Sequence, residues 1–357
     1  MPMRSLLLLA LLLAVLPVQA QVEGDFNGHP LQVFIQKNID PLGTDRLQFV
    51  DSLTGDVVPV EVNGRQYTPV GREVMFFDFA SNRVVLADPT GEINDHPFIQ
   101  PEANTQRIDW VIDPPRIAWT ITAVDEAGRL STTTYASLLD GTDRQAILAD
   151  GPRDGIRVLP VAFNDEQTVL YMDYQPAVGD FSPYQQYAGL FGLNLNTEQI
   201  QLLPDEPGCF CGAALGAGLL VRLELIENQG GFDVHVYNLE GLVNHTIPAL
   251  ELEGYTQAGD LHLSPDGSRA IYALAQISNF GGVNQSVRTI FVLVNLDDLT
   301  QAPLTDAITA FVKPVEWTED STALIFTSPD QDGTWKINLM GGLLERVASA
   351  TYLGTLK

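Results

Sequence analysis

A strand–turn–strand unit that recurs along the chain restricts its fold more than any other feature. The clearest copy runs from Leu261 to Leu274 and has Ser-Pro-Asp-Gly at positions 264–267. Pro265 sets φ for a tight turn, Asp266 can hydrogen-bond its own backbone, and Gly267 accepts a positive φ. The apolar run 270–275 that follows is typical of a buried strand. The unit therefore predicts two antiparallel strands joined by a short turn.

Six such turns divide most of the sequence into segments of similar length. They lie near positions 71, 113, 165, 217, 266 and 320, which are 42 to 54 residues apart. A repeat of about 40–50 residues is typical of one β-propeller blade. A pair of β-sandwiches or a β-solenoid would also contain short strands and turns, but the regular spacing favours a propeller.

A second recurring element indicates how many blades there are. It is an apolar strand that runs into a polar turn, and it occurs seven times, at 49–55, 85–91, 137–141, 193–197, 237–241, 294–298 and 337–341. We interpret it as the hairpin between the third and fourth strands of a blade. The first blade then lacks an innermost strand, which residues 351–356 can supply, because a propeller must close its ring to avoid an unpaired edge. We predict an all-β propeller with seven four-stranded blades; six blades, with an appended N-terminal hairpin, is the alternative.

Two of these units carry a family resemblance. The segment Leu-Ser-Pro-Asp-Gly-x-x-x-Ile-Tyr at 263–272 and the segment from Trp317 to Met340 resemble the repeat of TolB-type propellers, extracytoplasmic bacterial relatives of the WD-repeat class. The resemblance implies a propeller fold and a tendency to bind proteins. It transfers no catalytic residue, and the extra N-terminal α/β domain of TolB has no counterpart in this sequence.

The N-terminal segment is typical of a secretory signal peptide. A basic start at Arg4 precedes an apolar run over 6–16 and small residues before Ala20. The run is shorter than the ~20 residues that span a bilayer. We expect a signal peptide over 1–20, a single propeller domain over 21–357 without a membrane span, and a secreted or periplasmic location.

The charge of the chain argues against two classes of partner. The formal net charge is −26, although only 18% of the residues are charged. Such a field repels phosphate backbones and anionic membrane surfaces. We therefore expect no nucleic-acid partner, and instead a protein, small-molecule or glycan ligand bound by a monomer.

Long loops with aromatic residues are the candidate contact surface. Strand-two-to-three loops and inter-blade connections share one rim of a propeller, and exposed aromatic side chains on a rigid frame are typical of binding sites. The candidates on that rim are Tyr174, Phe181, Tyr184, Tyr187, Phe210 and Phe280. We expect replacement of Tyr184 and Tyr187 by alanine to abolish partner capture without lowering thermal stability; the alternative is that these side chains pack onto their own blade.

Other chemistry-bearing residues give weaker signals. Cys209 and Cys211 are the only cysteines, and in an oxidising compartment they form either a disulfide or two free thiols. His262 shares a strand face with Asp260 and Ser264, so it is a candidate metal ligand if that face lines the channel, although a structural role is the simpler interpretation. Asp330 and Asp332 precede Gly333 as in calcium loops, but the spacing also fits a hairpin.

No sequence motif assigns an enzymatic activity. Gly-x-Ser-x-Gly and His-Glu-x-x-His are both absent, and these patterns mark common hydrolase sites. The sequence therefore favours a secreted binding scaffold without a cofactor. The alternative is a propeller enzyme of the glycoside hydrolase or lyase type, which would use carboxylates at the channel mouth.

Overall fold

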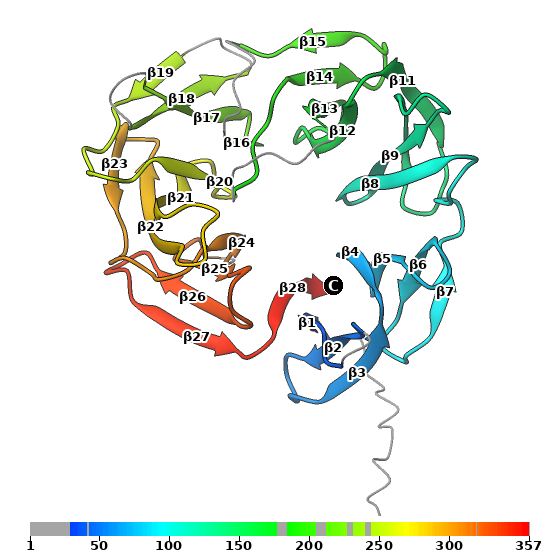
Figure 1. The fold of residues 1–357 in the computed structure, drawn as a ribbon, viewed down its shortest axis with the longest axis horizontal. Coiled ribbons are helices and arrows are strands. Elements are labelled where there is room, and N and C mark those ends of the chain that lie inside the picture. Colours follow the sequence, from blue (N-terminus) through cyan, green and yellow to red (C-terminus); the bar gives the residue numbers. More distant parts are fainter. Residues whose placement is uncertain are drawn as a thin grey trace, which may run out of the picture.

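The structure is a ring of seven four-stranded antiparallel sheets (Figure 1). It is a computed structural model, and it describes residues 29–40, 43–176, 184–204, 212–226, 231–239, 244–318 and 320–356. Every element within these residues is a β-strand. The described residues contain no helix that is long and apolar enough to cross a membrane.

The first four blades, each given from the innermost strand outward, are as follows. Blade 1 contains β28 (Thr351–Leu356), β1 (Leu31–Gln36), β2 (Asp45–Asp51) and β3 (Val57–Val62). Blade 2 contains β4 (Gly64–Val70), β5 (Glu73–Asp78), β6 (Arg83–Ala87) and β7 (Ile93–Asp95). Blade 3 contains β8 (Thr105–Asp113), β9 (Arg116–Val124), β10 (Leu130–Leu138) and β11 (Gln145–Arg153). Blade 4 contains β12 (Ile156–Phe163), β13 (Val169–Pro176), β14 (Leu190–Asn194) and β15 (Ile200–Leu202).

The last three blades complete the ring. Blade 5 contains β16 (Ala213–Gly216), β17 (Leu219–Leu225), β18 (Phe232–Asn238) and β19 (Asn244–Ile247). Blade 6 contains β20 (Gln257–Leu263), β21 (Arg269–Ser278), β22 (Ser286–Asn295) and β23 (Thr300–Pro303). Blade 7 contains β24 (Lys313–Trp317), β25 (Ala323–Thr327), β26 (Thr334–Asn338) and β27 (Leu344–Ala348).

Both repeated sequence elements occupy the places predicted for them. The six turns join the first and second strands of blades 2 to 7, and the seven polar turns join the third and fourth strands of all seven blades. Seven blades are therefore confirmed over six.

The C-terminal strand closes the ring, also as predicted. β28 pairs antiparallel with β1, with Leu356 opposite Leu31. Tyr352 anchors this strand to blade 7, because its backbone N–H donates to Thr334 Oγ1 at 2.9 Å and its hydroxyl donates to Glu316 Oε2 at 2.8 Å. The strand thus completes the four-stranded sheet of blade 1 and packs against blade 7, which closes the ring.

The innermost strands are irregular in a way that shapes the channel. Six of the seven, all except the short β16, have a register shift where they pair with the second strand of their blade. A bulge adds one residue to a strand and redirects the side chains beside it. Bulges at this level of the ring therefore alter which side chains reach the central axis.

The turns between first and second strands are linked from blade to blade along one rim. Gln167 Nε2 donates to the carbonyl of Asp113 at 2.9 Å, and Asp165 accepts from the backbone N–H groups of Ala217 and Gly218 at 3.2 and 2.9 Å. Within the clearest turn, Asp266 Oδ1 accepts from Ser264 Oγ at 2.6 Å. The polar side chains of these turns therefore also link neighbouring blades by hydrogen bonds.

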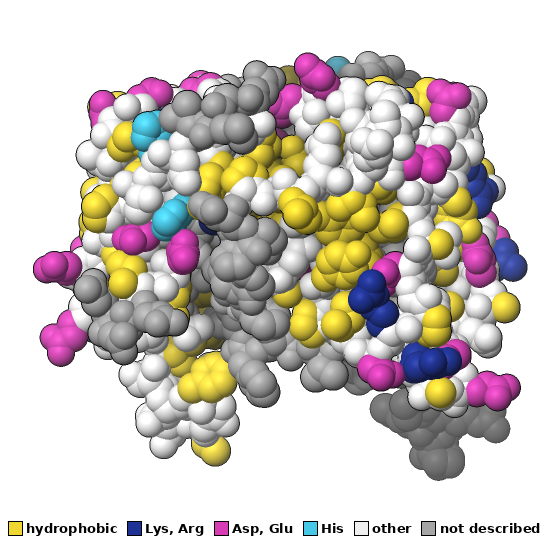
Figure 2. All heavy atoms as spheres, turned by 90° about the horizontal axis from the view of Figure 1, so that it is seen from above, with side chains coloured by type: hydrophobic (Ala, Val, Ile, Leu, Met, Phe, Trp, Pro, Cys, Tyr) yellow, Lys and Arg dark blue, Asp and Glu magenta, His cyan; other side chains and the backbone are white. Residues whose placement is uncertain are grey.

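Apolar packing between adjacent blades makes up the core. Phe291 of blade 6 and Phe326 of blade 7 meet edge to face with ring centroids 4.9 Å apart, and Trp119 of blade 3 is fully buried. The outer surface is acidic: Figure 2 shows Asp and Glu side chains spread across one side of the ring, whereas Lys and Arg gather in one half of that view.

Candidate functional site

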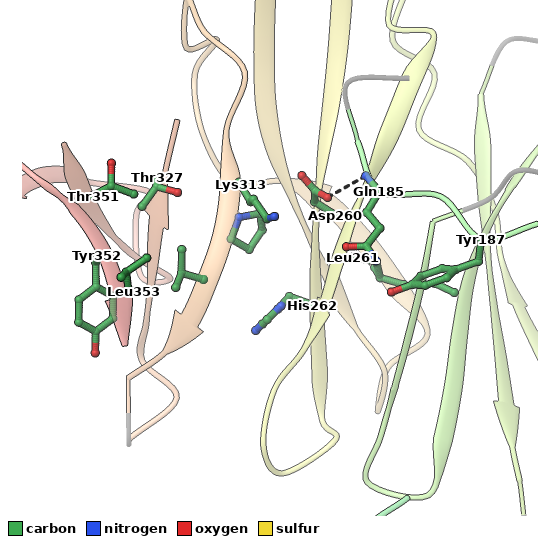
Figure 3. Close-up of a pocket in the computed structure, with 13 residues that line it drawn as sticks. Gln185, Tyr187, Asp260, Leu261, His262, Lys313, Thr327, Thr351, Tyr352 and Leu353 are labelled. Atoms are coloured by element: carbon green, nitrogen blue, oxygen red, sulfur yellow. Dashed lines mark hydrogen bonds between the residues drawn. The ribbon is translucent and has the colours of Figure 1, made fainter. Parts of the chain in front are cut away.

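A cavity of about 470 Å³ opens on the central channel. Its walls come from the innermost strands β16, β20, β24 and β28, and residues 185–187 of the β13–β14 connection form one side (Figure 3). Asp260, His262 and Lys313 line it together with Tyr187 and Tyr352. A concave site with a few convergent polar groups is where small ligands usually bind.

Asp260 occupies the bulge of β20 and has a left-handed backbone conformation, with φ near 50°. Asp is one of the few residue types that tolerate this region. Its Oδ1 accepts a hydrogen bond from the backbone N–H of Gln185 at 3.0 Å, shown by the dashed line in Figure 3. Burial raises the pKa of Asp260, while the Gln185 bond and the positive charge of Lys313 act in the opposite direction.

His262 lies two residues further along β20 and points into the same space as Lys313 (Figure 3). Burial lowers the pKa of His262 to about 4, and the Lys313 ammonium adds to the effect. His262 is therefore neutral at pH 7 and offers one donor and one acceptor nitrogen. The cavity combines a carboxyl group, a neutral imidazole and a cation.

The expectation that one face of this strand lines the channel holds for Asp260 and His262 but not for Ser264. Ser264 is buried in the following turn, where its hydroxyl bonds Asp266 and the carbonyl of Arg269. No local feature indicated that Lys313 would join the site, because it lies on the neighbouring blade.

The segment 184–189 crosses from blade 4 to blade 6, and we call it the strap. Tyr184 is only 3% exposed and packs in a cluster with Ile271 of blade 6 and Phe311 of blade 7. Its ring meets Phe311 edge to face at 6.0 Å. Gly259 permits this approach, because a Cβ there would collide with the Cβ of Tyr184. The strap therefore docks on β20 and forms part of the cavity wall.

The four aromatic rim candidates that the structure describes do not form one exposed surface. Tyr184 is buried and not exposed as expected, because its side chain packs in the apolar cluster between blades 6 and 7. Tyr187 is half-buried and lines the cavity. Tyr174 is half-buried as well; it packs on Phe191, and Arg153 lies over its ring at 5.3 Å.

Phe280 alone among the four described candidates is well exposed, at 58%. It lies at the tip of the hairpin between β21 and β22. Phe181, Phe210, Cys209 and Cys211 lie outside the described residues.

The two candidate calcium ligands lie in the hairpin between β25 and β26. Asp330 Oδ2 accepts from the backbone N–H of Phe311 at 2.8 Å, so this carboxylate holds the segment on which Tyr184 packs. The carbonyl of Asp332 accepts from Arg346 Nη2 at 2.8 Å. Within the described part of the chain, no group of three or more His, Cys, Asp or Glu residues is arranged to hold a metal ion.

Comparison with known proteins identifies a fold and no family. Neither a protein-family model nor a curated protein sequence matches the chain. Among solved structures, oligogalacturonate lyase in complex with manganese aligns with a TM-score of 0.54 at 13% identity, covering 90% of this chain and 86% of that one. A putative 6-phosphogluconolactonase from Bacteroides fragilis gives 0.54 at 14% identity, covering 92% and 98%.

A third match is one of two prolyl endopeptidases, with a TM-score of 0.59 at 11% identity. It covers 90% of this chain but only 50% of the endopeptidase chain, so this protein spans half the length of that structure. TolB from Acinetobacter baumannii is a more distant match, with a TM-score of 0.43 and 12% identity. Likeness at these identities is a likeness of fold: the chain is a seven-bladed β-propeller, an architecture shared by binding scaffolds and enzymes.

Proposed function

We propose that this protein is a secreted or periplasmic binding scaffold that holds a small polar ligand, or a polar group of a larger one, in its central channel. The observation that carries the proposal is the cavity at Asp260, His262 and Lys313. Ionisable groups with perturbed pKa values that converge in a concave space are candidates for a functional site. The leader-like segment 1–20 supports an extracytoplasmic location.

The polar groups of the cavity define what would fit there. Lys313 supplies a positive charge, Asp260 a carboxyl group with one oxygen bonded to the strap, and His262 a neutral donor and acceptor. Tyr187 and Leu353 add apolar surface. A hydroxylated or zwitterionic compound of modest size matches this combination, because it can pair with each group at once.

The test is a thermal-shift screen against amino acids, mono- and disaccharides and short peptides. Compounds that raise the melting temperature are then tested with two variants of blade 7. Val315 lines the cavity, so Val315→Trp fills it, whereas Val347 lies 46% exposed on β27 and Val347→Trp is the matched control. We expect binding to be lost only in Val315→Trp; equal binding by both variants would contradict the proposal.

An enzymatic role is the second candidate, and Asp260 and His262 favour it. Burial shifts the pKa of Asp260 towards neutral pH, which favours a role in proton transfer, and the neutral imidazole of His262 can orient a bound compound by accepting or donating a hydrogen bond. Lyase and lactonase titles among the structural matches show that this architecture supports enzymes. Turnover of a bound compound, abolished by Asp260→Asn with binding retained, would establish this role. Binding without turnover would favour the binding scaffold instead.

A further inference from the structure

Three arginine side chains lie at one level on the innermost strands of three successive blades. Arg65 is the second residue of β4, Arg107 the third of β8 and Arg157 the second of β12. Each pairs with a residue among the last three of the second strand of its blade, which places all three near the same end of the channel. In Figure 1 these strands lie on the side of the axis away from β20 and β24, and β4 is next to β28.

Direct contacts hold the three strands together. Trp110 Nε1 on β8 donates to Thr68 Oγ1 on β4 at 3.0 Å. β8 and β12 pack side by side. The arginines therefore belong to one rigid wall of the channel and not to mobile surface loops, and a rigid frame is what a preorganised binding site requires.

Positive charge on this wall exceeds negative charge. Arg107 Nε donates to Asp109 Oδ1 at 2.6 Å, which neutralises one of the three cations. Within the described residues, no acidic side chain forms an ion pair with Arg65 or Arg157. The imbalance is notable in a chain with 45 acidic and only 19 basic residues, where acidic partners are abundant.

Two of the guanidinium groups also have unused hydrogen-bond donors. The Nε atoms of Arg65 and Arg157 are buried without a hydrogen-bond partner among the described residues. Burial lowers the pKa of both arginines, repulsion from the Arg107 guanidinium adds to this, and attraction by the Asp109 carboxylate acts in the opposite direction. Buried donors and mutually repelling cations destabilise a fold unless something else satisfies them.

We propose that Arg65, Arg107 and Arg157 form an arginine wall that binds an oxyanion, namely the carboxylate, sulfate or phosphate group of a ligand entering the channel. Guanidinium groups donate in a fork that matches such groups, and their bonds to them are charge-assisted. An anion here would bond the unused Nε–H groups and screen the cations from each other. The arginine wall shares no residue with the cavity at His262, so the two sites are independent.

The experiment is isothermal titration calorimetry with citrate, sulfate and inorganic phosphate, at an ionic strength held constant with sodium chloride. The double variant Arg65→Gln/Arg157→Gln is compared with Arg46→Gln/Arg83→Gln, which changes the net charge equally; Arg46 is partly exposed on β2 and Arg83 is exposed on β6. We expect wild type and control to bind at least one anion. The double variant should bind it about tenfold more weakly, or worse, for each arginine removed. The anion that binds most tightly identifies the oxyanion group.

Stability without ligand separates binding from a structural role. If the arginines are placed for an anion, Arg65→Gln/Arg157→Gln melts at the same temperature as wild type or higher, and added anion stabilises only the wild type and the control. Val315→Trp should leave anion binding unchanged, because it changes only the cavity. The proposal is overturned if no anion binds the wild type, if both double variants are weakened equally, or if the arginine-wall variant melts several degrees lower.

Discussion

Truncation of Tyr184 tests whether the strap belongs to the folded core. Tyr184 is 3% exposed and lies between blades 6 and 7, although its own blade is the fourth. Replacing a buried aromatic residue by alanine typically costs about 3–5 kcal/mol, through lost transfer free energy and the cavity that remains. For a domain of this size, a loss of that order lowers the melting temperature by roughly 4–7 °C.

The assay is thermal unfolding followed by far-ultraviolet circular dichroism. Phe280→Ala is the matched control, because Phe280 is also aromatic but 58% exposed; it should change the stability by no more than about 0.5 kcal/mol. An unchanged melting temperature in Tyr184→Ala would refute the docking of the strap. Gly259→Ala should reproduce part of the loss, because the added Cβ collides with Tyr184.

Three further predictions follow from other parts of the ring. In NMR titration, His262 should show a pKa of about 4 that rises in Lys313→Met. Because its folded pKa lies below the unfolded value of 6.5, His262 lowers the stability of the fold as the pH falls from 6.5 towards 4. A titration midpoint near 6.5 would show that the imidazole is solvated. Hydrogen bonds from Ser264 and Ser268 lower the pKa of Asp266 to about 2. Asp266→Asn should therefore lower the free energy of unfolding by about 0.5–1 kcal/mol at pH 7, discounted for solvent exposure, as measured in denaturant melts. The difference between the two proteins should shrink as the pH falls from 3.8 towards 2, and a constant difference would contradict this. A chain truncated after Ala350 should aggregate in size-exclusion chromatography, because β1 loses β28, its partner on the inner side of blade 1. A stable monomer would argue against ring closure by β28.

The sequence predicted the architecture well because that architecture is repetitive. Turn chemistry such as Ser-Pro-Asp-Gly is local, and its spacing shows how many blades the chain contains. The closing strand followed from a general rule, since an innermost strand was missing from blade 1 and residues 351–356 were unassigned.

The site was harder to predict because it depends on contacts between distant blades. Tyr184 looked like an exposed loop residue, and nothing local indicated that its side chain would pack against Gly259 of blade 6. The only hint was that Gly259 interrupts a strand, since glycine within a strand often marks a close backbone approach. Lys313 joins His262 only because blades 6 and 7 are neighbours in the ring.

The arginine wall illustrates a signal that was present but unused. Arg65, Arg107 and Arg157 occupy equivalent positions only when the units are aligned by blade, and their strands are irregular because of the bulges. Alignment of the innermost strands against each other would have brought them together. Their unused donors, by contrast, are visible only in three dimensions.

Native mass spectrometry of the protein, purified from the cells that make it without dialysis, tests the central claim that the channel cavity holds a ligand. The account predicts a non-covalent species of defined mass on the wild type and on Val347→Trp, and its loss from Val315→Trp, which fills the cavity. The same bound species at the same occupancy on Val315→Trp would contradict the account and place the ligand elsewhere on the ring.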